Sequence, residues 1–305
     1  MYEEFFGFTK RPFRLVPESG MLFLTPKHAR ALSTLEYCLF DQVGLAIVTG
    51  GVGTGKSTLI QRFLDIAEAR ATVALITNTL FSADDVLAAV CAAFGIEYTP
   101  DDKWASFRRF EDFIHDQNEK GTRTILVIDE SQNLSVDALE ALRLLTNVNA
   151  NDQAAFQIVL VGQPEFLETL RLDELQQLAQ RVTMHFHLQP LLTAETFSYI
   201  RHRVSVVGGD PDIFEAEALA MIHLMTDGTP RLINTLCDLA LVSAFGAESQ
   251  KVTRDIVLGV LGELGPHTIL PLNQDSLGQT PAVLIKKSDQ ILRDLRQEVA
   301  STTSS

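Results

Sequence analysis

Two short stretches of the sequence hold residues whose types and spacing could do chemistry. The first, GGVGTGKS from Gly50 to Ser57, places a lysine and a hydroxyl directly after closely spaced glycines. Glycines let successive backbone N–H groups turn inward around phosphate oxygens, and the start of a following helix adds partial positive charge. The lysine then reaches the terminal phosphates of a nucleotide, and the hydroxyl takes one position around Mg²⁺. The spacing predicts a phosphate-binding loop rather than a chance glycine-rich turn.

We expect this loop to bind ATP, with Lys56 also acting in catalysis and Ser57 also holding Mg²⁺. The predicted nucleotide-binding residues of the loop are Gly50, Gly51, Val52, Gly53, Thr54, Gly55, Lys56, Ser57 and Thr58.

The second stretch, ILVIDESQNL from Ile125 to Leu134, joins an apolar run to two adjacent acids. Such a run is typical of a central strand of a parallel sheet, and a carboxylate buried at its end requires a compensating charge. We expect Asp129 to face the Mg²⁺ held by Ser57, and Glu130 to polarise a water molecule against the γ-phosphate. The pair therefore indicates hydrolysis, whereas two acids that only cap the next helix are the weaker interpretation.

Three further side chains extend the predicted site. Gln163 follows the next buried strand, in VGQPE, and should emerge beside Asp129 near the attacking water, unless it is only a turn residue before Pro164. Arg231 begins a helix in DGTPRLIN, where the helix dipole disfavours a cation, so the subunit's own phosphates explain it better than core packing does. Arg181 precedes the last strand, in LAQRVTMHF, and is predicted to reach a neighbour's site as an arginine finger rather than to form a surface salt bridge.

Two other sequence patterns are weaker indications of a functional site. His185 and His187 lie at i and i+2 on a strand, and because a metal site needs more ligands, a solvated strand face is the favoured interpretation. The segment SFRRF at 106–110 has the mixture of basic and aromatic residues of a nucleic-acid patch, but a helix with two exposed arginines explains it as well.

The elements that must position these residues alternate along the chain. Apolar runs, such as GLAIVTG at 44–50 and FQIVLVG at 156–162, predict strands. The segments between the runs have helical spacing, which indicates an α/β fold with a parallel sheet covered by helices on both faces. After Pro190 only helical patterns follow. We expect an aromatic, proline-rich segment packed on the core, a P-loop α/β core, an all-helical lid, and a linker with a helix and a disordered tail, over residues 1–28, 29–190, 191–264 and 265–305.

Composition limits the environment and the partners. The 305 residues have a net charge of −14, which argues against broad, non-specific nucleic-acid binding. No signal peptide and no run of about 18 apolar residues is present, so we expect a cytoplasmic protein that meets a membrane only through partners. The cysteines Cys38, Cys91 and Cys237 are odd in number and lack CxxC spacing, which predicts reduced thiols.

Together these motifs resemble the AAA+ ATPases of the general secretion pathway protein A (ExeA-like) type. Relatives of that family include pilus- and exopolysaccharide (exosortase)-associated ATPases and, more distantly, transposition ATPases of the TniB/TnsC type. The resemblance spans about residues 1–263 and is carried by GGVGTGKST, ILVIDESQNLSVDALEALRLLTN, IVLVGQPEFLETL, LQQLAQRVTMHFHLQPL and DGTPRLINTLCDLAL, among other segments.

The resemblance implies a core sheet of strand order 5-1-4-3-2, a helical lid, and ATP bound between the subunits of a ring or filament. By position it implies that Gln163 is sensor 1, Arg181 the arginine finger and Arg231 sensor 2. Secretion members of the family continue into a transmembrane helix and a periplasmic domain, neither of which we expect within these 305 residues.

The leading hypothesis is therefore a homo-oligomeric AAA+ ATPase that hydrolyses Mg-ATP at subunit interfaces. It would switch a partner complex, which could lie at the membrane, for envelope secretion or for exopolysaccharide or pilus assembly. The alternative is a DNA-associated ATPase regulator of the transposition type, which the acidic charge disfavours. A third interpretation is a signalling switch that holds ATP and hardly hydrolyses it.

Overall fold

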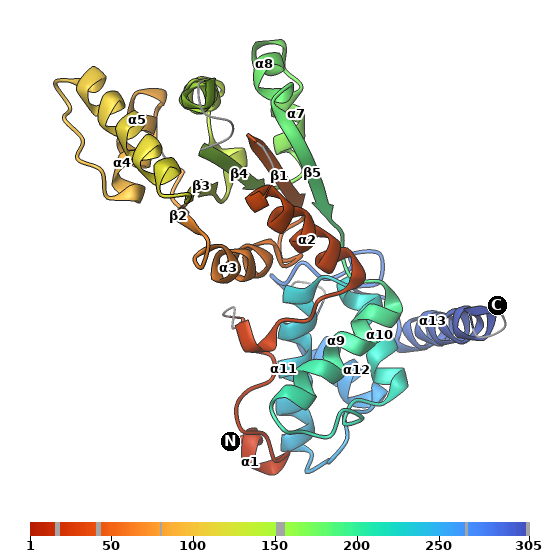
Figure 1. The fold of residues 1–305 in the computed structure, drawn as a ribbon. Helices are drawn as coiled ribbons and strands as arrows, with labels where there is room; N and C mark the ends of the chain where they lie inside the picture. Colours follow the sequence, from red (N-terminus) through yellow and green to blue (C-terminus); the bar gives the residue numbers. More distant parts are fainter. Residues whose placement is uncertain (16–18, 41–43, 80, 151–155, 266–267, 303–305) are drawn as a thin grey trace. The chain divides into compact units, whose positions relative to one another are not determined.

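The computed structural model describes residues 1–15, 19–40, 44–79, 81–150, 156–265 and 268–302. They form two compact units (Figure 1). The helical unit comprises Met1–Thr25, Gly53–Gly55 and Gln189–Ser305, and the α/β unit comprises Pro26–Val52 and Lys56–Leu188.

The α/β unit alternates strands and helices, as the sequence predicts. Its strands are β1 (Leu45–Gly50), β2 (Ala71–Ile76), β3 (Arg123–Ile128), β4 (Phe156–Gly162) and β5 (Val182–Leu188). Its α-helices are α2 (Pro26–Phe40), α3 (Lys56–Ala67), α4 (Val86–Phe94), α5 (Lys103–Glu119), α6 (Val136–Leu145), α7 (Phe166–Leu170) and α8 (Gln176–Ala179). Its short 3₁₀ turns are η2 (Ala83–Asp85), η3 (Ser131–Asn133), η4 (Thr146–Ala150) and η5 (Asp173–Leu175).

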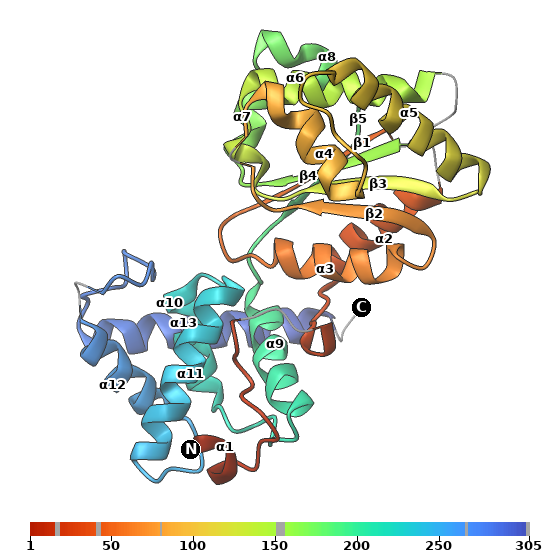
Figure 2. The same cartoon turned by 90° about the vertical axis from the view of Figure 1, so that its left-hand side faces the viewer.

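The five strands form one parallel sheet in the order β2-β3-β4-β1-β5. This is the predicted order 5-1-4-3-2 read from the other edge, so that prediction is confirmed. Helices α2 and α3 cover one face, and α4, α5 and α6 cover the other (Figure 2). Successive residues of a strand point to opposite faces, so Val48 joins the core beneath α3 while Ile47 joins the core on the opposite face.

The register of the sheet decides where the polar residues after the strands lie. Thr49 of β1 pairs with Gly162 of β4, and Ile128 of β3 pairs with Leu160 of β4. The carboxyl ends of these three neighbouring strands therefore meet at one edge of the sheet. The segments that follow them carry the predicted loop, the two acids and Gln163.

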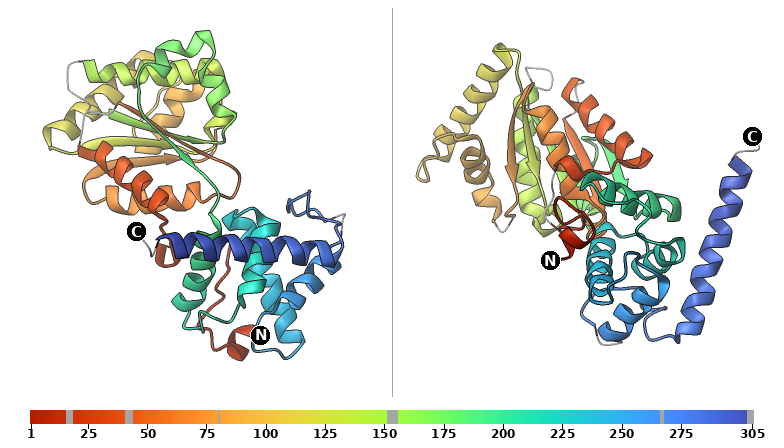
Figure 3. Two further views of the ribbon diagram at one scale, coloured as in Figure 1. Left: turned by 90° about the vertical axis from the view of Figure 1, so that its right-hand side faces the viewer. Right: turned by 90° about the horizontal axis from the view of Figure 1, so that it is seen from below.

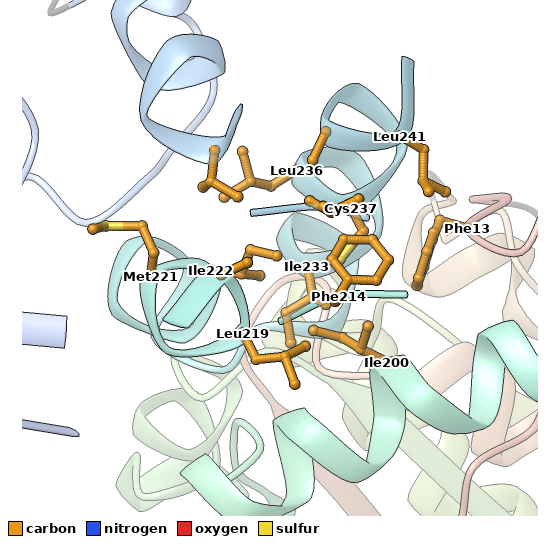
Figure 4. Close-up of a cluster of buried hydrophobic side chains, with 14 of the residues drawn as sticks. Phe13, Ile200, Phe214, Leu219, Met221, Ile222, Ile233, Leu236, Cys237 and Leu241 are labelled. Atoms are coloured by element: carbon orange, nitrogen blue, oxygen red, sulfur yellow. The ribbon is translucent and has the colours of Figure 1, made fainter. Parts of the chain in front are cut away.

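The helical unit contains the N-terminal segment and the helices after residue 189. Its elements are α1 (Tyr2–Phe5), η1 (Ser19–Met21), α9 (Thr193–Val206), α10 (Ala216–Thr226), α11 (Pro230–Gly246), α12 (Arg254–Leu264) and α13 (Pro281–Thr302). Figure 4 shows the centre of its core, where Phe13 lies beside Phe214 with ring centroids 5.8 Å apart. The aromatic side chains of the N-terminal segment thus pack into this core, and Tyr2, Phe6 and Phe8 are buried in it as well.

Helix α13 runs along one side of the helical unit as a long blue rod (Figure 3). It packs on α10 and buries Leu284 and Leu292. Residues 303–305 of the predicted disordered tail lie outside the described residues, as does the side chain of Cys38. Cys91 and Cys237 are free and buried. Among the described residues, no helix combines the length and the apolar character that crossing a bilayer requires.

Candidate active site

The glycine-rich loop joins the carboxyl end of β1 to the first residue of α3. Gly53 and Gly55 have φ values of 78° and 99°, a backbone region that side chains with a Cβ rarely adopt, so glycine suits both positions. Lys56 is buried, and its Nζ donates to the carbonyl oxygens of Gly50 at 2.8 Å and Gly51 at 3.1 Å. The ammonium group is therefore held against the beginning of its own loop.

The other loop residues differ in exposure. Val52 is 62% exposed, whereas Thr54 is buried and Thr58 is half-buried at the start of α3. Ser57 is exposed at the N-terminal end of the helix, so its hydroxyl is available at the edge of the sheet.

Asp129 lies directly after β3, where its backbone N–H donates to the carbonyl of Ile76 at 2.9 Å. Its Oδ2 accepts a hydrogen bond from the Ser57 hydroxyl at 3.4 Å, and its Oδ1 accepts from the backbone N–H of Glu130 at 2.9 Å. Burial raises the pKa of Asp129 above its ordinary value, and this outweighs the opposing effects of that N–H and of Lys56. The two predicted Mg²⁺ ligands are thus adjacent.

Lys56 has opposite charges nearby but remains poorly solvated. Burial lowers the pKa of Lys56, while the carboxylates of Glu130, Asp129 and Glu165 act in the opposite direction. A cation and several acids share a partly dehydrated edge of the sheet, an arrangement that is typical of functional sites.

Glu130 immediately precedes the η3 turn and has a left-handed backbone conformation, with φ of 54°. Its carbonyl accepts a hydrogen bond from the hydroxyl of the buried Thr79, at 3.2 Å. Its carboxylate Oε2 accepts from Nε2 of Gln132 at 2.6 Å, and Oε1 of Gln132 accepts from the backbone N–H of Gln163 at 3.0 Å. No motif of the sequence assigns a role to Thr79 or Gln132. The signal available for each is that a polar residue follows a buried strand by a few positions.

The two predicted arginines occupy different units. The guanidinium of Arg181 lies at the C-terminal end of α6, where Nη1 donates to the carbonyl of Arg143 at 3.2 Å and to Oγ1 of Thr146, and Nη2 donates to Oδ1 of Asn147 at 2.7 Å. Arg231 lies exposed in the first turn of α11 in the helical unit. Within that unit its backbone N–H donates to the carbonyl of Gly53 at 3.2 Å.

The structure also shows where the two weaker sequence patterns, the histidine pair of β5 and the SFRRF segment, lie. His185 and His187 are exposed on the face of β5 opposite Met184, and the Thr49 hydroxyl lies 2.9 Å from Nε2 of His185 and 3.0 Å from Nδ1 of His187. In the part of the chain that the structure describes, no cluster of three or more His, Cys, Asp or Glu side chains could hold a metal ion. In the SFRRF segment, Arg109 donates to Oγ1 of Thr99 at 3.0 Å.

The fold and the loop together define a P-loop NTPase fold of the AAA class. A family model described as an AAA domain matches residues 41–170. The solved ORC2 protein of Aeropyrum pernix, in its ADPNP–ADP complexes, superposes with a TM-score of 0.62 at 15% identity, covering 84% of this chain and 72% of that chain. At such low identity this likeness concerns the fold alone.

Two curated proteins are similar in sequence. The chain is 39% identical over 256 residues to the General secretion pathway protein A of Aeromonas hydrophila, covering 83% of this chain and 46% of that protein. It is 28% identical over 186 residues to the Mu-like prophage FluMu DNA transposition protein B of Haemophilus influenzae, covering 59% of this chain and 60% of that protein. The resemblance to the general secretion pathway protein A family is thereby confirmed, although the chain spans less than two thirds of either relative.

Proposed function

We propose that the chain binds ATP with Mg²⁺ at this edge of the sheet and hydrolyses it at the subunit interfaces of a homo-oligomer. Turnover would switch a partner complex for envelope secretion or surface-structure assembly. The observation that supports this most is the gathering of Lys56, Ser57, Asp129 and Glu130 at the ends of β1 and β3.

The residues present fit a bound Mg²⁺. Ser57 Oγ and Asp129 Oδ2 are hard oxygen donors that lie 3.4 Å apart. Neighbouring oxygens around an octahedral ion are about 3 Å apart when each is about 2.1 Å from the metal. Burial raises the pKa of Asp129 despite the nearby charge of Lys56, so its ionised form keeps an unfavourable free energy that a divalent cation would offset. When bound, Mg²⁺ neutralises charge on the β- and γ-phosphate oxygens.

The chain's own residues provide the other contacts to the phosphates and to the attacking water. Lys56 leaves its two carbonyl partners to contact the β- and γ-phosphates, and the start of α3 contributes backbone N–H groups to the phosphates. Glu130 accepts the proton of the attacking water, and Gln163 contacts that water or the γ-phosphate. Arg231 contacts the phosphates of its own subunit.

Arg181 acts on the site of a neighbouring subunit in this proposal. Its acceptors on α6 and η4 are neutral oxygens, so among the described residues its positive charge stays available to an anion. The same three contacts fix its position at the end of α6. Arginine fingers are worth roughly 10³–10⁵ in rate where they have been measured.

The link to secretion is supported by the General secretion pathway protein A of Aeromonas hydrophila, which is 39% identical over most of this chain. The chain spans 46% of that relative, so the partner complex is part of the proposal.

Phosphate release from Mg-ATP tests the assignment of the site. Lys56→Ala should lose nucleotide binding, because no other side chain of the loop carries a positive charge. Glu130→Gln should bind ATP normally and release phosphate about 10²–10⁴-fold more slowly, which is the usual contribution of a general base. Glu174→Gln, which removes an exposed carboxylate from the same unit, is the matched control. Wild-type turnover by Glu130→Gln would remove the assignment of the base.

Mixing variants tests the arginine finger. Lys56→Ala protein cannot hold ATP but still presents Arg181, whereas Arg181→Ala protein has an intact loop. Excess Arg181→Ala protein mixed with Lys56→Ala protein should therefore recover part of the turnover. When the double variant Lys56→Ala/Arg181→Ala replaces Lys56→Ala in this mixture, no turnover should be recovered. Equal turnover in both mixtures would show that Arg181 does not act in trans.

One observation favours the DNA-associated alternative, namely the 28% identity to the FluMu DNA transposition protein B. In that case ATP-dependent retention on duplex DNA should appear at low salt and fall steeply as salt rises. Absence of retention at low salt would exclude this alternative.

A further inference from the structure

Gln132 is bonded at both ends of its side-chain carboxamide. Nε2 donates to Oε2 of Glu130 at 2.6 Å, and Oε1 accepts from the backbone N–H of Gln163 at 3.0 Å. A backbone N–H can only donate, so the amide oxygen must face Gln163 and the NH₂ group is left for the carboxylate. The chemistry of the two neighbours therefore dictates the orientation of the amide.

The turn that carries Gln132 is held in place around it. Glu130 has a left-handed backbone, which a residue other than glycine keeps only where its surroundings impose it. The carbonyl of Glu130 accepts from Thr79 at 3.2 Å and from the backbone N–H of Asn133 at 3.0 Å. The buried Ser131 hydroxyl donates to the carbonyl of Ile128 at 2.9 Å. These contacts fix the η3 turn against the ends of β2 and β3.

The end of β4 approaches Gln132 so closely that a Cβ at Gly162 would make tight contacts. A Cβ at Gly162 would lie 3.2 Å from Oε1 of Gln132 and 3.4 Å from both its backbone nitrogen and Cβ of Phe166. The absence of a side chain at Gly162 therefore lets the carboxamide reach the next backbone N–H. Gln132 thus connects the turn after β3 to the end of β4.

We propose that Gln132 is a positioning residue for ATP hydrolysis, which orients the carboxylate of Glu130 and couples it to the strand end that carries Gln163. This inference rests on the proposed role of Glu130 as the base. Glutamate has several rotatable bonds, and one short hydrogen bond to Oε2 restricts them. Among the described residues Oε1 of Glu130 has no hydrogen-bond partner, so it can accept the proton of the attacking water.

Three substitutions at Gln132 separate orientation from folding. Gln132→Leu keeps the approximate size but removes both hydrogen bonds. Gln132→Asn keeps the carboxamide on an arm one methylene shorter. Gln132→Glu keeps an acceptor for Gln163 and replaces the donor to Glu130 with a second acid. Asn133→Ala, in the same turn with an exposed side chain, is the matched control.

We expect Gln132→Leu to lower kcat about 10-fold or more, because small displacements of a reacting group are costly, while KM for ATP stays within about twofold. Gln132→Asn should fall between Gln132→Leu and wild type. Asn133→Ala should match wild type. Unchanged kcat in Gln132→Leu, or a rise in KM with kcat preserved, would overturn the inference.

The split between kcat and KM is a readout that a purely structural role would not give. Gln132→Glu keeps an acceptor for the backbone N–H of Gln163 but loses the donor to Glu130, so its kcat should fall at least as far as that of Gln132→Leu. A wild-type kcat in Gln132→Glu would count against the inference.

The same assays distinguish the two proposals. If wild-type protein releases no phosphate that depends on Lys56, the proposed function fails, and the inference fails with it. If wild type and Glu130→Gln behave as proposed while every variant of Gln132 matches wild type, only the inference fails.

Discussion

Two buried cations show how differently the two units use charge. Lys56 in the α/β unit is 8% exposed, and Arg203 in the helical unit is 7% exposed. Both donate to backbone carbonyls. Lys56 bonds to those of Gly50 and Gly51, just before it in the chain, whereas Arg203 bonds to those of Pro12 and Arg14 at 2.6 and 3.1 Å.

The partners of the two cations explain the difference. The guanidinium of Arg203 uses a third nitrogen on the hydroxyl of Tyr199, which in turn donates to Asn234 at 2.7 Å. That network is closed and attaches the N-terminal segment to α9. Lys56 instead lies among acids, and burial lowers its pKa while it raises that of Asp129. Buried polar groups that stabilise a fold find hydrogen-bond partners within it. Buried charged groups of a functional site keep an unfavourable desolvation free energy, which a bound ligand can offset.

Substituting Asp129 should have the largest effect and should separate function from stability. Asp129→Asn should slow phosphate release about 10²–10³-fold, the usual cost of losing one electrostatic contact to the reacting group. Because folding raises the pKa of this carboxyl, its ionised form destabilises the folded state at neutral pH, and the midpoint of thermal unfolding without nucleotide should hold or rise. Phosphate release and calorimetry at pH 7 check both expectations.

Asp112→Asn, at an exposed position of α5, is the control and should change neither quantity. A lower unfolding midpoint for Asp129→Asn would show that the carboxylate stabilises the unit, and the contrast with the helical unit would then fail.

Substituting Arg203 should affect the stability of the fold rather than the rate of phosphate release. Arg203→Met removes the three hydrogen bonds that the buried guanidinium donates, and should lower the free energy of unfolding by about 2–3 kcal/mol. Arg201→Met, on the same helix, removes only an exposed ion pair with Asp212 and should cost at most about 1 kcal/mol. Urea unfolding followed by circular dichroism measures both, and equal costs would contradict the closed-network interpretation.

The smallest effect should be the loss of stability at acid pH that His223 causes. The imidazole of His223 lies 3.2 Å from Oγ1 of Thr193 and 2.9 Å from Oγ1 of Thr196, and burial lowers the pKa of His223 despite the opposing charge of Asp227. The unfolded chain then binds the proton more readily. The free energy of unfolding should therefore fall as pH drops below about 6.5.

His223→Gln keeps a hydrogen-bonding side chain but cannot titrate, so its unfolding midpoint should fall less than that of wild type between pH 7 and 5. His185 and His202 also have lowered pKa values, and both are present in each protein. The difference between the two proteins therefore isolates His223. Identical pH dependences would contradict the prediction.

The sequence by itself determined the local elements and the type of fold. Apolar runs bounded by glycine and acids predicted the strands, because burial on both faces requires continuous apolar residues. The P-loop spacing predicted which strand ends in a glycine turn, and the family resemblance implied the strand order that the sheet has. The observed β1 and β4 begin and end within one residue of the predicted strands.

Only the tertiary structure decided which distant polar groups meet. Gln132 bridges Glu130 and Gln163 because the register of β3 against β4 brings their ends together, and Arg203 finds carbonyls about 190 residues away in the chain. The sequence pattern predicted that the N-terminal aromatic residues pack on a core, but it gave no signal that they complete the core of the helical unit. Hydrogen bonds depend on distance and direction to fractions of an ångström, and these are set by packing and strand register rather than by periodicity.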